Sequence, residues 1–360
     1  MPNFDFSKEI ELCANINIDW SKLDNKVIMI TGATGLIGKF LVQVLLYRNT
    51  QHNIHTRIVA VGRNKEKFNS RFSDYTNNTD LIFYEHDVQK PCDYSGRLDM
   101  IIHMASNTHP RLYATDPIGT EMTNIFGTYY LLQKAAENQG CRFVLASSGD
   151  VYGDNRSNKE FLSEEDCGYI DCNTLRAGYI EGKRASEALC NAFKEEKGVD
   201  FVIARLCRIY GVTMQVEDSK AISQFIKMAI KGEDIVLKSK GGQTFSYLYI
   251  YDAVTALLTI MTIGATGCAY NVADNSQTIS LSNLAALLAG IGHSKVVLDI
   301  PDNIESKGAS TFQNVKLDAN KLYDLGWHCR VRMRDGLLYT VEEMKKMNHI
   351  IWGEHIKKRK

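Results

Sequence analysis

Tyr179 and Lys183 stand four residues apart in the stretch GYIEGK, and together they could carry out acid–base chemistry. The surrounding pattern predicts a helix over about 175–197, so this spacing places both side chains on one helix face. A nearby ammonium group lowers the pKa of a phenol from its reference value of ~10. The phenolate can then accept a proton from a substrate hydroxyl, which is general-base catalysis. The same spacing also occurs on ordinary surface helices, so the surrounding elements must decide whether this pair is catalytic.

Two further polar side chains, Ser148 and Asp150, follow the apolar run RFVLASS at 142–148. The hydroxyl of Ser148 could hold the same substrate oxygen as Tyr179. Asp150 has two interpretations. It takes part in the chemistry, or it caps the turn after the strand by accepting backbone N–H bonds, as aspartate often does. The residue types alone leave both interpretations open.

A glycine-rich turn, TGATGLIG, stands between the apolar run KVIMI and the helical segment KFLVQVLLYR. Its glycines, Gly32, Gly35 and Gly38, permit a tight turn and let backbone N–H groups approach a pyrophosphate, while the helix N-terminus adds positive potential. Because the turn lies between a strand and a helix, which is the context that this motif requires, we expect it to bind a dinucleotide.

The end of the second expected strand, VGRN, bears on which dinucleotide is bound. An acidic residue there would bind the ribose 2′-hydroxyl, but Gly62 and Arg63 leave room and positive charge for a 2′-phosphate instead. The sequence therefore favours NADP slightly over NAD. Asp87, at the end of the third strand, either accepts a hydrogen bond from the adenine amino group or caps the next turn.

The elements that must position these residues predict an α/β fold. From residue 26 to 211, short runs rich in valine and isoleucine alternate with helical segments, which is typical of a doubly wound parallel sheet of the Rossmann type. The six expected strands are KVIMI, RIVAVGR, LIFYEHDV, LDMIIHMA, RFVLASS and VDFVIARL. Residues 212–342 predict a smaller mixed α/β substrate-binding domain, whose strands can interchange with the first. Residues 1–25 are expected to form an extension, and 343–360 a basic C-terminal helix or tail.

The overall composition argues against several classes of function. The formal net charge of the 360 residues is +0, which gives no support for binding to nucleic acid or to a membrane surface. No apolar run approaches the ~20 residues of a membrane helix, and the N-terminus lacks the features of a secretory signal. Nine cysteines without a C-x-x-C pair predict reduced thiols in a cytoplasmic protein, and the histidines show no metal-ligand spacing.

On these motifs the chain resembles the extended short-chain dehydrogenase/reductase family, in its branch of nucleotide-sugar epimerases and dehydratases. The resemblance covers about residues 26–342 and rests on the stretches TGATGLIG, HDV, IIHMAS, NIFGTYYLL, LASSGDVYG, GYIEGKRASE, ARLCRIYG, YLYIYDAVTALL, AYNVAD and LDANKLYDLGW. It implies a cofactor that is transiently reduced and then reoxidised, and a substrate sugar carried on a nucleoside diphosphate. It also implies a homodimer joined through the helices around 119–138 and 175–197.

The resemblance also implies roles for individual residues. Ser148, Tyr179 and Lys183 fall on the catalytic positions of the family. The residues expected to contact the cofactor are Gly32, Thr34, Gly35, Leu36, Ile37, Gly38, Arg63, Asp87, Val88, Ala105, Ser106, Tyr179 and Lys183. Arg208 stands where the family often has an asparagine that contacts the substrate diphosphate, and Arg111 offers another cation for the substrate. For both arginines, structural ion pairing is the alternative.

Asp150 and its neighbours bear on which reaction follows. In members that eliminate water, an acidic pair commonly occupies the positions of Gly149 and Asp150. In decarboxylating members a lone acid stands at the second position, and in simple epimerases both residues are usually small or hydroxylic. The family often has an arginine at the position of Phe245, which holds the diphosphate or, in decarboxylating members, a substrate carboxylate. The phenylalanine therefore argues against decarboxylation.

The first expectation is thus an NAD(P)-dependent epimerase that oxidises a nucleotide sugar at C4 and returns the hydride. A 4,6-dehydratase or a UDP-glucuronate decarboxylase is the alternative within the same chemistry. An NADPH-dependent 4-keto-sugar reductase would instead consume cofactor in each turnover. A cofactor-sensing scaffold is the alternative outside catalysis, and the presence of Tyr179 together with Lys183 argues against it.

Overall fold

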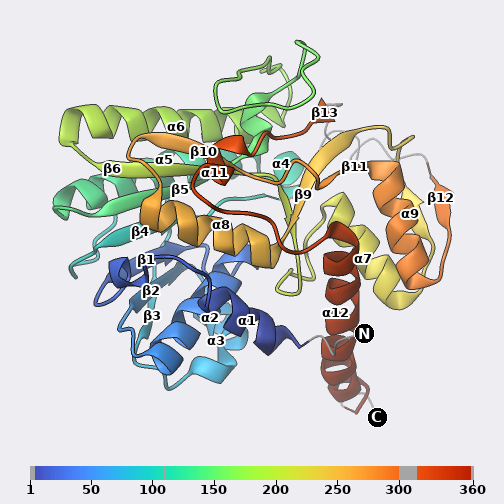
Figure 1. Cartoon of the computed structure of the whole chain (residues 1–360), viewed down its shortest axis with the longest axis horizontal. Coiled ribbons are helices and arrows are strands. Elements are labelled where there is room, and N and C mark those ends of the chain that lie inside the picture. The colour runs from blue at the N-terminus through green and yellow to red at the C-terminus, as the bar shows by residue number, and fades with distance from the viewer. Residues whose placement is uncertain (1–4, 109, 300–313, 358–360) are drawn as a thin grey trace.

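The computed structural model describes residues 5–108, 110–299 and 314–357, with a seven-stranded parallel sheet at the centre (Figure 1). The strands lie in the order β10-β6-β5-β4-β1-β2-β3. Their bounds are β1 Val27–Thr31, β2 Arg57–Gly62, β3 Leu81–Glu85, β4 Met100–His103, β5 Arg142–Ser148, β6 Asp200–Leu206 and β10 Cys268–Val272. The order reverses between β1 and β4, and ligands of doubly wound sheets bind beyond the carboxyl ends of the strands at such a point.

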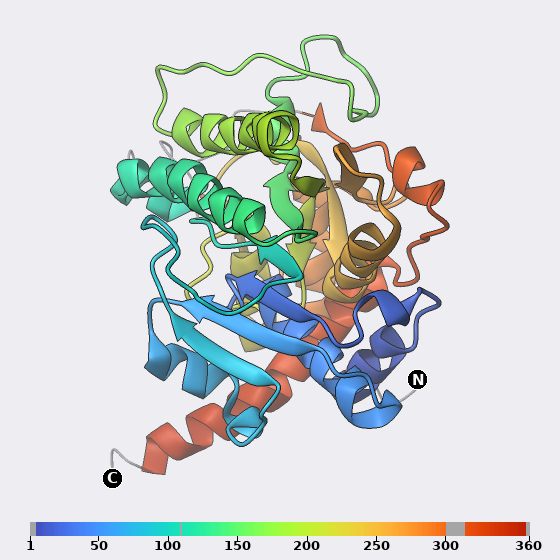
Figure 2. The same cartoon turned by 90° about the vertical axis from the view of Figure 1, so that its left-hand side faces the viewer.

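Helices cover both faces of this sheet, so the strands β1, β2 and β4 are mostly apolar on both sides. Along β1, Ile28 and Ile30 join one apolar cluster, whereas Met29 joins another. On the Met29 side, α5 (Pro117–Glu137) and α6 (Ala177–Lys197) pack side by side (Figures 1 and 2). The helices α2 (Leu36–His52) and α8 (Ile250–Ile263) contribute to the other cluster, and α1 (Phe6–Ala14) packs against both of them.

A second region lies beside the carboxyl ends of the central strands. In one small sheet, β9 (Thr244–Tyr249) pairs with β7 (Arg208–Tyr210), β11 (Thr278–Ser280) and β13 (Asn314–Val315). The pairing of β7 with β9 is parallel, and it sets Arg208 opposite Tyr247. The remaining elements of the second region are β8 (Ile235–Leu237), which pairs with β12 (Val296–Leu298), and the helices α7 (Ala221–Lys231), α9 (Leu281–Gly292), α11 (Asn320–Tyr323) and α12 (Met333–Lys357).

Short elements complete the described chain. They are α3 (Lys65–Arg71), α4 (Pro110–Thr115) and three 3-10 turns at Trp20–Lys22, Ser73–Tyr75 and Gly149–Tyr152. None of the helices in the described ranges is long and apolar enough to cross a membrane.

The six strands and the parallel sheet predicted from the sequence are confirmed. The structure differs in the use of the run AYNVA, which the sequence pattern placed in the second domain. It forms β10 and pairs with β6 at the edge of the central sheet, an interchange that the prediction had allowed. The helix α8 comes before β10 and packs on one face of the central sheet. It thereby brings the chain back to the edge strand β6.

Candidate active site

A cavity of about 1430 Å³ lies at the carboxyl edge of the central sheet, between that sheet and the second region. Its walls come from the glycine turn, the ends of β4 and β5, the start of α6, and β7, α7 and β9. Every site residue predicted from the sequence lines this one cavity: Gly32, Thr34, Gly35, Leu36, Ile37, Gly38, Arg63, Asp87, Val88, Ala105, Ser106, Arg111, Ser148, Asp150, Tyr179, Lys183 and Arg208. Their individual roles remain predictions.

At one end of the cavity, the backbone of the glycine turn lies close to the chain that leaves β4. Gly32 has φ +70°, and a Cβ there would lie 2.8 Å from the carbonyl carbon of Met104. A Cβ on Gly38 would lie 2.3 Å from the carbonyl oxygen of Gly32. Gly35 caps α2 without a side chain, so the first N–H groups of that helix stay open toward the cavity. This cradle fits a pyrophosphate, as the motif predicted.

The same end continues past β2, where Gly62, Arg63 and Lys67 line the cavity. Asp87 also lines it, and its carboxylate accepts a hydrogen bond from the backbone N–H of Gln89 at 3.1 Å. The turn-capping interpretation of Asp87 is therefore confirmed, while its contact with adenine remains a prediction. We call this part of the cavity, from the glycine turn to Lys67 and Asp87, the dinucleotide end.

At the other end, α6 carries Tyr179 and Lys183 into the cavity from one helix face. Burial, and to a lesser extent the nearby Asp150, raises the pKa of Tyr179 to about 12, while a hydrogen bond with the side chain of Ser148 opposes the shift. Burial lowers the pKa of Lys183 to about 8, and its ammonium donates to the carbonyl oxygen of Ala146 at 2.7 Å. The arginines Arg176 and Arg208 also act to lower the pKa of Tyr179, and the role of Lys183 remains a prediction.

Asp150 is buried beside Tyr179, and its carboxylate lies between two guanidinium groups. Arg176 donates to Oδ2 at 2.7 Å, and Arg208 lies 3.7 Å from Oδ1. The cap of the turn at 149–152 is the hydroxyl of Ser148, which accepts from the backbone N–H of Asp150 at 3.1 Å. The capping interpretation of Asp150 is therefore wrong, because a neighbouring hydroxyl already fills that place.

Arg208 lies over the ring of Phe245, with its guanidinium carbon 3.6 Å from the ring centre. The strand pairing explains this contact, since Arg208 faces Tyr247 and Phe245 is two residues away on the same side of β9. The phenol of Tyr247 is also hydrogen-bonded to Arg208. The guanidinium of Arg208, on β7, therefore lies against Phe245 on β9, where the sequence argument had noted the lack of a cation. We call the group of Ser148, Asp150, Arg176, Tyr179 and Arg208 the charged end of the cavity.

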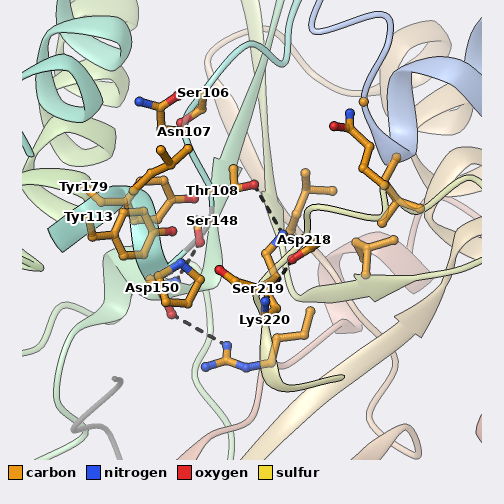
Figure 3. A pocket seen from close by; sticks show the side chains of 18 of the residues that line it. Ser106, Asn107, Thr108, Tyr113, Ser148, Asp150, Tyr179, Asp218, Ser219 and Lys220 are labelled. Carbon is orange, nitrogen blue, oxygen red and sulfur yellow. Dashed lines mark hydrogen bonds and ion pairs between the residues drawn. The ribbon is translucent and has the colours of Figure 1, made fainter. Parts of the chain in front are cut away.

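Two residues in or next to the charged end were not predicted. Arg176 stands at the start of α6, one helical turn before Tyr179, and its guanidinium lies 5.5 Å from the ring centre of Tyr113. Tyr113, on α4, stacks against Tyr179 with the ring centres 4.9 Å apart (Figure 3). The i, i+3 spacing of Arg176 and Tyr179 could have indicated the arginine. The position of Tyr113 depends on how α4 packs, which no local pattern reveals.

Arg111, the other predicted substrate residue, is exposed on α4 at the rim of the cavity. Here α4 and the chain before it meet the second region, because the backbone N–H of Arg111 lies 3.5 Å from Oγ of Ser219. Nearby, Lys220 donates to the hydroxyl of Thr108 at 3.3 Å (Figure 3). These contacts close one side of the cavity. Within the described ranges, no cluster of histidine, cysteine and acidic side chains could hold a metal ion.

Comparison with known proteins agrees with this architecture. Among curated relatives, UDP-glucuronic acid decarboxylase 1 of Xenopus tropicalis is 29% identical over 344 residues, which cover 94% of this chain and 77% of the relative. UDP-glucuronic acid decarboxylase 1 of Arabidopsis thaliana is 30% identical over 321 residues, covering 88% of this chain and 69% of the relative.

Solved structures share the fold at lower identity. UDP-glucose 4-epimerase from Thermotoga maritima gives a TM-score of 0.76 at 22% identity, covering 89% of this chain and 99% of that one. A dTDP-glucose 4,6-dehydratase from Streptomyces venezuelae, solved with NAD, gives 0.75 at 21% identity, covering 90% and 98%. The family model described as "NAD dependent epimerase/dehydratase family" matches residues 28–273. The chain therefore belongs to the NAD-dependent epimerase/dehydratase family.

Proposed function

We propose that the protein oxidises the sugar of a nucleoside diphosphate glucuronate at C4 and then releases the sugar carboxylate as CO₂. The observation that carries this proposal is the charged end of the cavity, where two arginines lie beside the predicted general base Tyr179. The curated relatives described above, which are UDP-glucuronic acid decarboxylases, support it. This proposal differs from the first expectation, which was an epimerase. The reason is that Arg208 lies over Phe245 and supplies a cation where the sequence had none.

The first step is assigned to Tyr179 and its neighbours. Ser148 holds the C4 hydroxyl, and Tyr179 accepts its proton as a general base. When bound, the cofactor would supply the nicotinamide that accepts the hydride from C4 and gives it back. Lys183, whose ammonium donates to the carbonyl oxygen of Ala146, keeps one face of α6 fixed against β5 and offers its remaining donors to a cofactor ribose.

The second step needs little further help from the protein. Oxidation at C4 makes the substrate a β-keto acid, so the C5–C6 bond can break with its electron pair moving into the C4 carbonyl. CO₂ leaves, and C5 then takes up one proton. Elimination of water would instead require an acid for the leaving hydroxyl and a base for the C5 proton. Gly149 supplies neither, and Asp150 is held by Arg176, so we place the 4,6-dehydratase behind the decarboxylase.

Epimerisation at C4 is the second candidate, because it shares the first step and needs no acidic pair. Incubation with UDP-glucuronate and analysis of the product by NMR separates the two. We expect a UDP-pentose. A UDP-galacturonate product would establish epimerisation, and stoichiometric consumption of added NADPH with a 4-keto sugar would establish a reductase.

We infer that the cofactor is NADP, because Arg63 and Lys67 offer positive charge for a 2′-phosphate at the dinucleotide end. Mass analysis of the dinucleotide released on denaturation tests this inference, and recovery of NAD alone would overturn it.

We further infer a homodimer through α5 and α6. On α5, Ile118, Phe126 and Tyr129 are exposed apolar side chains, which is unusual on a helix that meets only water. Light scattering of the purified protein should give twice the chain mass. A cytoplasmic location remains a prediction from the sequence.

A further inference from the structure

Arg208 is held on three sides by this chain while it still faces the cavity. Its guanidinium lies over Phe245, 3.7 Å from Oδ1 of Asp150, and is hydrogen-bonded to the phenol of Tyr247. About a quarter of the arginine side chain remains exposed, at 26%. We propose that Arg208 binds the carboxylate of the substrate sugar and so selects uronic over neutral sugars. This proposal rests on the proposed function and names the residue that determines its specificity.

The position of Arg208 favours the sugar carboxylate over the diphosphate, its expected partner from the sequence. Asp150 is two residues from Ser148, which is hydrogen-bonded to Tyr179 and thereby marks the place of C4. A uronic carboxylate is attached to C5, the next ring carbon. The diphosphate is attached to C1, on the opposite side of the ring. A guanidinium that contacts Asp150 therefore lies at the C4 end of the ring, which is nearer to a carboxylate on C5 than to a diphosphate on C1.

The balance of charge points the same way. Asp150 is shared, because both Arg176 and Arg208 contact its carboxylate. A partly buried guanidinium that shares its carboxylate with a second arginine favours a further anion. Oδ1 of Asp150 has no hydrogen-bond partner among the described residues, because 3.7 Å is too long for one. Asp150 thus orients Arg208 without using up its N–H donors.

Phe245 completes the arrangement by fixing the plane of the guanidinium. The ring is buried, and a cation over an aromatic face is attracted by the ring quadrupole. With one face against Phe245, the planar fork can present two parallel N–H groups to a carboxylate, the geometry in which arginine binds carboxylates best. A lysine at this position would keep the charge but lose the fork.

The test compares three ligands on the cofactor-loaded enzyme: UDP, UDP-glucose and UDP-glucuronate. Tyr179→Phe serves as the background, so that binding is measured by calorimetry without turnover. Without further change, UDP-glucuronate should bind more tightly than UDP-glucose. Adding Arg208→Gln should weaken UDP-glucuronate by roughly 10- to 100-fold, the range for a lost charged hydrogen bond. The affinities for UDP and UDP-glucose should stay within about threefold. With Arg208→Lys, the affinity for UDP-glucuronate should lie between that of the Tyr179→Phe background and that of the Arg208→Gln variant.

Phe245→Leu, also in the Tyr179→Phe background, tests the arrangement without removing any charge. It should weaken UDP-glucuronate by about three- to tenfold, as expected for loss of a cation–π contact. Arg111→Gln is the matched control, because it removes another cavity cation and should affect all three ligands alike. A variant that retains the cofactor is folded. If Arg208→Gln loses the cofactor, Arg208→Lys and Phe245→Leu provide the test instead.

Three results would overturn the proposal. Equal losses for UDP and both sugars in Arg208→Gln would place the arginine on the diphosphate. Unchanged binding of UDP-glucuronate would leave it a structural residue. Equal affinity of the unsubstituted site for UDP-glucose and UDP-glucuronate, or binding of neither, would show that no such selection exists. If the wild-type enzyme releases no CO₂ yet Arg208 governs discrimination, the proposed function fails while this inference stands.

Discussion

The two ends of the cavity are built in different ways. At the dinucleotide end the backbone makes the site, and glycines are needed because side chains would collide with the main chain. At the charged end the side chains make the site, and they come from β5, the 3-10 turn at 149–152, the start of α6, and β7. A site made by backbone depends on one short segment. A site made by charged side chains depends on how distant segments pack.

The largest expected effect comes from breaking the backbone cradle. In Gly32→Val, the new Cβ would lie 2.8–2.9 Å from backbone atoms of Met104 and Ala105, at a φ of +70° that valine rarely adopts. We expect the protein to lose its cofactor completely and to unfold at a lower temperature. Both are measured by cofactor absorbance and calorimetry. Gly290→Ala is the control, because a Cβ there would meet nothing within 4 Å and the residue does not line the cavity. Normal retention of cofactor by Gly32→Val would contradict the backbone account.

Removal of the predicted general base should have the next largest effect. Tyr179→Phe keeps the stacked ring against Tyr113 but removes the proton acceptor. General acid–base catalysis is typically worth ~10²–10⁴-fold, so kcat should fall by that much. Cofactor content should stay unchanged, because the dinucleotide end does not depend on the phenol. A variant within a few-fold of the wild-type kcat would remove Tyr179 from the mechanism.

Asp150→Asn should disturb the charged end while sparing the dinucleotide end. It leaves Arg176 and Arg208 facing each other without the carboxylate between them, which should destabilise the fold by roughly 3 kcal/mol. We expect kcat/KM for UDP-glucuronate to fall about tenfold, chiefly through KM, since the arginines lose their orientation. Transient reduction of the cofactor should still be visible. A large fall in kcat with unchanged KM would instead make Asp150 a proton donor or acceptor.

The smallest effect concerns a buried acid outside the cavity. Burial raises the pKa of Glu9 on α1 to about 8, although the hydroxyl of Tyr249 donates to its carboxylate at 2.7 Å and opposes the shift. The folded protein therefore keeps this proton at a pH where the unfolded chain, with a pKa near ~4.3, has lost it. Stability should fall as the pH rises from about 4.3 to about 8, and then level off.

Glu9→Gln should flatten this slope and leave kcat unchanged, because the residue is remote from both ends of the cavity. Denaturant unfolding at several pH values measures the slope. An unchanged slope in the variant would show that Glu9 does not titrate in this range.

The contrast between the ends also decides what the sequence could predict. Gly32, Gly35 and Gly38 lie in one turn, so their spacing already contains the geometry, and the alternation of strands and helices sufficed for the central sheet. Arg208 was predicted as a substrate residue, but its position beside Phe245 was not, because that position depends on the register between β7 and β9. The position of β10 was missed for a similar reason, since an apolar run does not indicate which sheet it joins.

The most direct test of the central claim follows the carboxylate carbon of the substrate. The cofactor-loaded enzyme is incubated with UDP-glucuronate labelled with ¹³C at C6, without added cofactor, and both the sugar and the dissolved carbonate are followed by NMR. We expect the label to appear as CO₂ and bicarbonate, one equivalent for each UDP-pentose formed, with the cofactor returned to its oxidised state. Label that stays in a six-carbon UDP-sugar would contradict it.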